Sequence, residues 1–412
     1  MANKNNDRGV DFARPDPAGV EQAVAAWMRH IQELAGKIGP RGSATEGERR
    51  GSQYCAEVLA GLGFEPQVET FPSSGSVFRP HLVASVALLA AFAIYPLAGK
   101  VSAWVSAAIA VFVMSSEVLE LGLRDNPLRW ALPKRPSQNV YAVAEPKKGQ
   151  ARQDLVLIGH VDTQRTPIIF STPEWLTVYR FLSTTAFASF FAQIAIYIYG
   201  ALTGAPWVWP VSVIPSTFAL LLLALTVHAE LTPFTPGAND NASAAGLVLA
   251  LGEVLRSEPM EHTRVWLVCT GSEEALHEGA RHFFAAHKAE MVRPKTINFE
   301  MLGVTGPSWL VREGIVTSLY PSPELRALAE RIAEAMPELE AYPSKIEGGV
   351  TEASDSIIAG VPAITLAGMD RSNHAPHWHK LSDTPDKMRP DVMAKAYTLA
   401  WAMMTALDTQ AR

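Results

Sequence analysis

The sequence predicts an α/β protein in which helices flank a sheet and two apolar helical hairpins interrupt the folded domain. The first observation is that the polar parts of the chain alternate between stretches with apolar residues at helical spacing and short β-branched runs, as α/β domains do. The second is that two long blocks are almost free of charged side chains, and each is long enough to cross a bilayer twice. The chain of 412 residues can also bury a large core.

The helices and strands of the polar parts are expected in a regular order. Apolar residues recur at helical spacing in 20–38 and in 52–62, and Gly63 is a plausible helix stop. Strand-like runs occupy 64–71, 140–144, 154–158 and 264–270. The last two have the composition of strands that are buried on both faces. Because ligands bind at the carboxyl ends of strands in open α/β sheets, the residues after these two strands are candidates for a functional site.

The two uncharged blocks predict membrane-spanning hairpins. In the first block, 81–99 and 101–116 contain no Asp, Glu, Lys or Arg, and only Lys100 lies between them. The second block, 181–229, has no such residue at all, and 200–206 supplies a turn in its middle. The alternative is a set of buried core helices, but an uncharged run as long as the second block exceeds what one such helix needs.

This organisation predicts one polar domain built from three separate segments. Each hairpin returns the chain to the side it left, so residues 1–80, 121–178 and 231–412 can fold together, with hairpins at 81–120 and 179–230. Basic residues gather on the domain side of the spans, against Lys100 alone on the other side. These residues are Arg79, Arg124, Arg129, Lys134, Arg135 and Arg180. The bias predicts a multi-pass membrane protein whose domain is cytoplasmic.

Composition narrows the classes of partner. The formal net charge is −6, so the chain lacks the basic excess that follows a phosphate backbone, and nucleic acid is not an expected partner. Cys55 and Cys269 have no metal-ligand spacing and are expected to be buried apolar residues. Segment 1–19 is polar, without an apolar stretch after its charges, which predicts no cleavable signal peptide. The sequence gives no oligomeric state.

Two candidate metal ligands follow from local context. His160 comes directly after the strand 154–158, and Asp162, two positions later, could accept its second ring N–H. Taken alone, a structural histidine is the more common explanation. Asp240 lies in 237–244, where small residues precede an apolar helical stretch. A carboxylate there can bridge two cations, although an ordinary turn that caps a helix has the same pattern.

Three further patterns supply oxygen and nitrogen ligands. Glu273 and Glu274 follow the strand that ends at Thr270, and two adjacent carboxylates are costly there unless a metal neutralises one; a solvated surface pair is the alternative. Glu300 stands among apolar residues, where a charge needs a partner. His379 is the last of three histidines in a loop that could instead lie at the surface. In chain order these residues could hold two zinc ions that share a carboxylate.

With these motifs in place, the sequence resembles the co-catalytic zinc exopeptidases, which include bacterial secreted aminopeptidases, aminopeptidase Y and glutamate carboxypeptidase. Further similar segments are 38–43, Asn139 with Val140, Asp355 in 353–356, and 360–363. The resemblance implies a phosphorylase/hydrolase-like α/β fold with a mixed, mostly parallel sheet. It also implies an exopeptidase with peptide substrates, most simply an aminopeptidase, which the predicted spans would anchor in a membrane.

The resemblance assigns roles to the site residues. It implies one zinc ion held by His160, Asp240 and Glu300, and a second held by Asp240, Glu274 and His379. Asp162 would orient His160, and Glu273 would be the general base that takes a proton from metal-bound water and delivers it to the leaving amine. His379 is preferred over its two neighbouring histidines because its spacing to Asp383 matches the closing motif of the family.

Two features depart from the family pattern. The position of Glu300 is usually aspartate, so one metal ion could be displaced. The insertion 181–229 replaces a short connection, and we expect both hairpins to leave the domain near the site and hold it close to a bilayer surface.

Other functions stay open at this point. The chain could be a carboxypeptidase, or a glutaminyl cyclase with one metal ion, although the Glu273–Glu274 pair favours hydrolysis. A noncatalytic receptor or scaffold would be expected to have lost ligands, and here every position is filled. A transporter would be expected to carry ionisable residues within its spans, and the proposed spans have no Asp, Glu, Lys or Arg.

Overall fold

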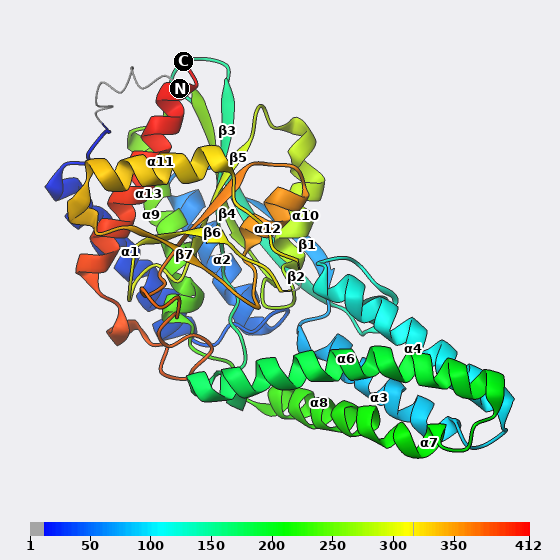
Figure 1. Cartoon of the computed structure of the whole chain (residues 1–412). Coiled ribbons are helices and arrows are strands. Elements are labelled where there is room, and N and C mark those ends of the chain that lie inside the picture. Colours follow the sequence, from blue (N-terminus) through cyan, green and yellow to red (C-terminus); the bar gives the residue numbers. More distant parts are fainter. Residues whose placement is uncertain (1–11, 316) are drawn as a thin grey trace, which may run out of the picture.

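The computed structural model describes residues 12–315 and 317–412 of the chain. Figure 1 shows an α/β domain with a bundle of long helices that projects from one end of it. Residues 1–11, which form most of the segment for which no signal peptide is expected, lie outside the described residues.

One sheet forms the centre of the α/β domain. Its strands are β1 Gln67–Ser73, β2 Arg135–Ala144, β3 Gln153–His160, β4 Thr263–Thr270, β5 Lys295–Glu300, β6 Ser308–Arg312, β7 Tyr342–Lys345 and β8 Ala363–Ala367. Their order in space is β1-β2-β4-β3-β5-β8-β6-β7. The pairs from β4 through β3 and β5 to β8 are parallel, as is β6 with β7, and the remaining three pairs are antiparallel. The predicted α/β fold class with a mixed, mostly parallel sheet is confirmed.

Helices cover both faces of the sheet. The longer ones are α1 Pro17–Ile31, α2 Glu46–Gly61, α9 Ser243–Ser257, α10 Glu278–His287, α11 Pro323–Ala335, α12 Glu352–Ile358 and α13 Pro390–Gln410. The shorter ones are η1 Gln32–Ile38, η2 Ile168–Phe170, η3 Ala238–Ala242, η4 Lys288–Glu290, η5 Pro337–Leu339, η6 Pro385–Lys387 and α5 Pro127–Ala131. Helix α9 packs on β3, β4 and β5, with α1 outside it.

The central strands have apolar side chains on both faces. Leu155 and Leu157 of β3 enter the large core beneath α9, whereas Val156 and Ile158 enter a smaller core with Phe283 of α10. Side chains alternate across a strand, so a continuous apolar run is what a strand covered on both faces requires.

Several element boundaries differ from the sequence-based expectations. The expected helix 20–38 consists of α1 followed by η1, which has a π-helical hydrogen-bond pattern. Helix α2 begins at Glu46, earlier than expected. Its first turns are charged and carry little apolar periodicity, so the sequence pattern becomes helical only later. Strand β1 begins only at Gln67, directly after Pro66, whose ring nitrogen cannot donate a ladder hydrogen bond.

The two apolar blocks form a four-helix bundle (Figure 1). Its helices are α3 Phe78–Ile94, α4 Lys100–Leu121, α6 Pro173–Thr203 and α8 Val213–Leu231, with the short α7 Val208–Val211 between the last two. They pack in a ring of α3 with α4, α4 with α6, α6 with α8, and α8 with α3. Helix α6 ends where Gly204 takes a left-handed conformation (φ +75°), within the expected turn.

The bundle is apolar on its outer surface as well as in its interior. Val101, Phe112 and Leu220 are 70%, 50% and 56% exposed, whereas small and apolar residues such as Ala110 and Val113 are buried. Three helical segments are long and apolar enough to cross a membrane by length and composition. These segments are Lys100–Leu121, Pro173–Thr203 and Val208–Leu231. The fourth expected span, α3, is apolar but has 17 residues.

The chain order brings the bundle next to the carboxyl ends of the central strands. Strand β3 leads through η2 into α6, and α8 leads back to η3, while α3 and α4 stand between β1 and β2. The ends of β3, β4 and β5 lie side by side because these strands are parallel neighbours. The fold therefore collects the residues that follow these strands at one edge of the sheet, beside the base of the bundle.

Candidate metal centre

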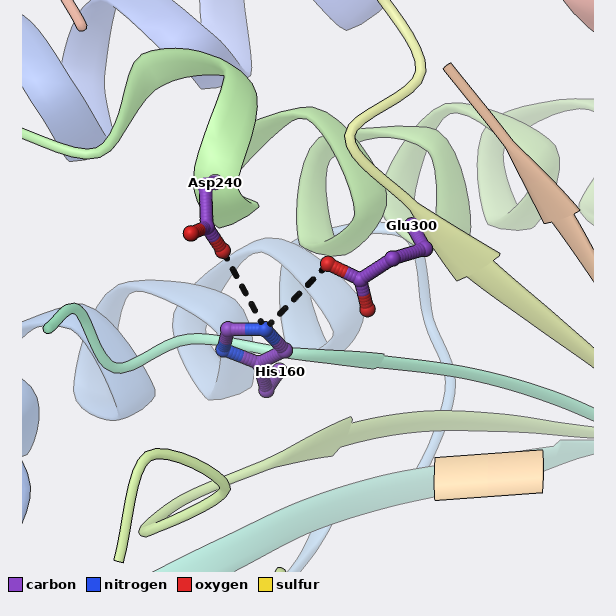
Figure 2. Close-up of side chains that lie close together, drawn as sticks. All are labelled: His160, Asp240 and Glu300. Atoms are coloured by element: carbon purple, nitrogen blue, oxygen red, sulfur yellow. Dashed lines mark ion pairs between the residues drawn. The ribbon is translucent and has the colours of Figure 1, made fainter. Parts of the chain in front are cut away.

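His160 is the last residue of β3, and its imidazole is buried. Its ring nitrogen Nδ1 lies 3.0 Å from the carbonyl oxygen of Asp162, which fixes the ring orientation. Figure 2 shows the ring facing the carboxylates of Asp240 and Glu300. The Nε2 atom lies 3.6 Å from Oδ1 of Asp240 and 3.8 Å from Oε1 of Glu300.

A second group of three lies on the other side of Asp240. The Nε2 atom of His379 is 3.2 Å from Oδ2 of Asp240 and 3.3 Å from Oε1 of Glu274. Asp240 therefore turns one oxygen toward His160 and the other toward His379. Within each group of three, the candidate ligand atoms all lie within 4.8 Å of one another.

The loop that carries Asp240 is held from two sides. The carboxylate of Asp383 accepts hydrogen bonds from the amides of Asn239 and Asp240, at 2.8 and 2.9 Å. Gly237 begins the loop with φ +63°, and a Cβ there would lie 2.2 Å from Cγ2 of Thr163. Only glycine combines this backbone conformation with so close a contact.

Asp162 has a wider role than the one expected of it. Its carboxylate accepts hydrogen bonds from the amides of Glu273 and Glu274, at 3.0 and 3.1 Å, and from Oγ of Ser43 at 2.6 Å. Its Oδ1 lies 3.5 Å from Nδ1 of His160, so its carbonyl oxygen is the nearer partner of that ring. Asp162 thus orders the Glu273–Glu274 loop in addition to His160.

Burial and mutual repulsion shift the pKa values of the acidic residues in the two groups. Burial is the main cause that raises the pKa of Glu274 to about 8, and the nearby carboxylate of Asp240 adds to the increase. Burial also raises the pKa of Glu300, to about 7. Burial lowers the pKa of His379, but the carboxylates of Glu274 and Asp240 outweigh it and raise the value to about 10. Without a cation beside them, the two buried acids Glu274 and Glu300 therefore hold their protons more tightly than exposed glutamates do.

Glu273 belongs to neither group but lies beside them. Its Oε2 is 3.7 Å from Nε2 of His160, and its Oε1 is 3.0 Å from Nε2 of His277. Burial raises the pKa of Glu273, yet the nearby imidazoles of His160 and His277 outweigh it and lower the value to about 2. Glu273 is therefore ionised at neutral pH and can accept a proton.

The residues of the two groups fit a pair of zinc ions. Among residues 12–315 and 317–412, three of their buried oxygens have no hydrogen-bond partner, namely Oδ2 of Asp240, Oε1 of Glu274 and Oε2 of Glu300. Buried unpartnered carboxylate oxygens are costly unless a cation satisfies them. Imidazole nitrogen and carboxylate oxygen are also the donors that zinc accepts.

A small cavity of about 140 Å³ opens onto both groups. The two groups and Glu273 line one side of it. The other side is apolar, with Val77, Leu276, Met301, Ile346, Val350 and Trp378. Val77 immediately precedes α3, so the entry to the first hairpin forms part of the wall.

The structure brings together all seven residues that the sequence singled out. These are His160, Asp162, Asp240, Glu273, Glu274, Glu300 and His379. The neighbouring histidines belong to neither group: His374 is exposed, and His377 contacts Oγ of Ser382.

Sequence reasoning missed Gln164, whose Nε2 donates to Oε2 of Glu274 at 2.8 Å, and it missed His277. Neither has a motif of its own, since each is defined by a contact to another segment.

The fold and the site together are similar to those of zinc-dependent hydrolases with an α/β sheet. The model of peptidase family M28 matches residues 217–404. That segment contains Asp240, Glu273, Glu274, Glu300 and His379, and it begins after His160. The resemblance predicted from the motifs is therefore confirmed.

A curated relative agrees over a short region. Aminopeptidase YwaD of Bacillus subtilis is 31% identical over 88 residues, which is 21% of this chain and 19% of the relative. The match thus spans about a fifth of the length of that aminopeptidase.

Solved structures share the fold over nearly the whole chain. A zinc aminopeptidase from Bacillus subtilis aligns with a TM-score of 0.56 and 13% identity, covering 96% of each chain. A leucine aminopeptidase precursor from Bacteroides thetaiotaomicron gives 0.55 and 11%, covering 96% of this chain and 99% of that one. A glutaminyl cyclase from Fimbriiglobus ruber gives 0.54 and 16%, covering 97% and 99%. At these identities the likeness shows the fold alone.

Proposed function

We propose that this protein is a membrane-anchored di-zinc exopeptidase that removes residues from the amino end of peptides. The observation that carries the proposal is the arrangement of Asp240 between two ligand groups, with Glu273 beside them but part of neither. Two metal ions that share a carboxylate, next to a free base, are the parts that peptide hydrolysis needs.

The proposed ligands follow from the two groups. His160, Asp240 and Glu300 would hold one zinc ion, and Asp240, Glu274 and His379 would hold the other. When bound, the ions would polarise the carbonyl of the scissile bond and make a water molecule more acidic.

Glu273 would act as the general base. Its Oε2 points toward the groups, whereas its Oε1 is occupied by His277. Oε2 would accept a proton from the attacking water and return it to the nitrogen of the leaving amine. The neighbouring carboxylate, Glu274, is directed to His379 instead, so the two adjacent glutamates have separate tasks.

The lining of the cavity favours the amino end of a substrate. Recognition of a terminal carboxylate calls for a cation such as arginine, and the described residues that line the cavity include neither Arg nor Lys. Acidic residues such as Glu300 and Glu273 suit a terminal ammonium group. The apolar side of the cavity suits a small uncharged side chain next to it.

The bundle would anchor the enzyme in a membrane. The apolar outer surface of α4, α6 and α8 supports two inserted hairpins at 81–120 and 179–230, with 1–80, 121–178 and 231–412 as one peptidase domain. The basic bias beside the spans supports a cytoplasmic position for that domain. Native membranes washed with alkaline carbonate would retain the protein, and its release would contradict the anchoring.

Hydrolysis by the purified full-length protein in lipid nanodiscs tests the proposed activity. We expect chelator-sensitive release of p-nitroaniline from aminoacyl p-nitroanilides, with about two zinc ions per chain. Glu273→Gln should lose at least about 100-fold in kcat while it keeps its zinc. Glu330→Gln, an exposed residue of α11, is the matched control and should be unchanged.

The same preparation separates the alternatives. Release of ammonia from amino-terminal glutamine, without chromogenic turnover, would assign a glutaminyl cyclase instead. Cleavage only at the carboxyl end of peptides would reverse the assigned direction. A zinc-loaded protein with none of these activities would contradict an enzymatic role.

A further inference from the structure

His277 connects Glu273 to a second buried carboxylate. Its Nε2 lies 3.0 Å from Oε1 of Glu273, and its Nδ1 lies 2.7 Å from Oδ2 of Asp355 in α12. The side chains of His277 and Asp355 are 5% and 1% exposed. Ionised carboxylates accept but do not donate, so both ring nitrogens donate and the ring is held from both ends.

The backbone around His277 is arranged for this contact. His277 has a left-handed conformation, φ +56° and ψ +33°, which is unusual for a residue other than glycine, asparagine or aspartate. Its amide donates to the carbonyl oxygen of Glu273 at 2.6 Å, so a tight turn folds His277 back over the residue that it contacts. A strained residue that is kept in place by its surroundings often has a functional reason.

We propose that His277, itself oriented by Asp355, is a positioning residue that holds the carboxylate of Glu273 in its working orientation. The two oxygens of Glu273 have different surroundings: Oε1 is fixed by the ring of His277, and Oε2 faces His160 and the cavity. A carboxylate that is fixed through one oxygen loses little freedom when the other takes a proton, which is what general-base catalysis requires. The inference rests on the proposed role of Glu273 as base.

The chain offers a matched control on the same helix. His287, at the other end of α10, also lies between two carboxylates, with Nε2 at 2.6 Å from Oε1 of Glu69 and Nδ1 at 2.5 Å from Oε1 of Glu290. Its side chain is 11% exposed, close to the value for His277, and it does not line the cavity. His277→Leu and His287→Leu therefore each remove a buried imidazole held between two carboxylates. The carboxylates beside His287 are more exposed, at 33% and 57%, and only His277 faces the site.

Kinetics of the full-length, zinc-loaded variants form the first test. We expect His277→Leu to lower kcat by about 10- to 100-fold with KM and zinc content unchanged. Asp355→Asn should have a smaller effect in the same direction, and the double variant should be less impaired than the product of the two single effects. His287→Leu should keep its kcat. Equal kcat losses in the two leucine variants, or kcat of His277→Leu within twofold of wild type, would overturn the proposal.

A second readout does not depend on activity. In protein with ¹⁵N-labelled histidine, the wild-type chain should show both ring N–H signals of His277, and Glu273→Gln should shift the Nε2 signal more than the Nδ1 signal. Asp355→Asn should shift the Nδ1 signal more. Absence of these shifts would overturn the orientation by two carboxylates. If the shifts appear but the wild-type protein hydrolyses no substrate, the proposed function fails while the contact is upheld.

Discussion

The α/β domain and the helical bundle distribute their side chains in opposite ways. In the domain, apolar residues such as Leu157 are buried, and the polar residues at the strand ends are buried as well. In the bundle, apolar residues such as Phe112 and Leu220 are half exposed, while many of the interior residues are alanine. The difference is what the proposed membrane anchoring predicts, with water around the domain and lipid around the bundle.

The two regions meet through a buried network of charges. Arg129, in the segment that follows α4, is 1% exposed. Its Nε donates to Oε2 of Glu120 at 3.0 Å, and its Nη1 donates to Oε1 of Glu278 at 2.6 Å and to the carbonyl oxygen of Ala275 at 2.9 Å. Ala275 follows Glu274 directly, so one guanidinium joins the bundle to the loop that carries two site residues.

The largest expected effect is the loss of stability when Arg129, the cation that joins the two regions, is removed. Arg129→Met should destabilise the protein by about 3–5 kcal/mol, because Glu120 and Glu278 would remain buried without their partner. Arg124→Met, at an exposed position of the same segment, is the control and should change the free energy of unfolding by less than about 0.5 kcal/mol. Denaturant unfolding in detergent gives both values. A similar result for both variants would mean that the network does not join the regions.

The same residue marks a limit of sequence reasoning. Arg129 is one of the six basic residues that flank the predicted spans, and the structure buries it between two carboxylates. Arg79 likewise contacts Glu230, at 3.2 Å. Lys134 lies 3.8 Å from Oε1 of Glu278, so three of the six flanking cations are partly neutralised within the fold. A count of basic residues includes their charges, but it does not include the acidic residue that a distant segment places beside each of them.

More of the candidate site than of its surroundings was predictable. His160 and Glu273 follow strands with a strong apolar pattern, and parallel strands bring their ends to one edge, so convergence followed from local signals. His277 and Asp355 are 78 positions apart, and their contact depends on how α10 and α12 pack. The local sequence predicts where strands end, but it does not predict such contacts between distant elements.

A charged residue placed on the outer surface should distinguish a surface that faces lipid from one that faces water. Phe112, midway along α4, and Val68 of β1 are 50% and 56% exposed. Phe112→Lys should oppose membrane insertion by about 3 kcal/mol, whereas Val68→Lys, in contact with water, should be nearly neutral. The amount of each variant in the membrane fraction measures the difference. Equal accumulation of both would contradict a lipid environment for the bundle.

The smallest expected effect concerns the contact between a candidate ligand and the segment that leads into the second hairpin. The ring of Phe170, just before α6, packs edge-on against His379, with 4.4 Å between ring centroids. Phe170→Ala should remove about 1 kcal/mol of support for that imidazole, which corresponds to about fivefold weaker zinc binding.

Phe92→Ala is the matched control, because it removes a stacked contact with Trp209, another residue of the bundle, 5.5 Å between centroids. It should lower bundle stability and leave zinc affinity unchanged. Zinc competition with a fluorescent chelator measures both variants. If Phe170→Ala binds zinc as tightly as wild type, the bundle touches the site without supporting it, and the two regions are energetically separate at that point.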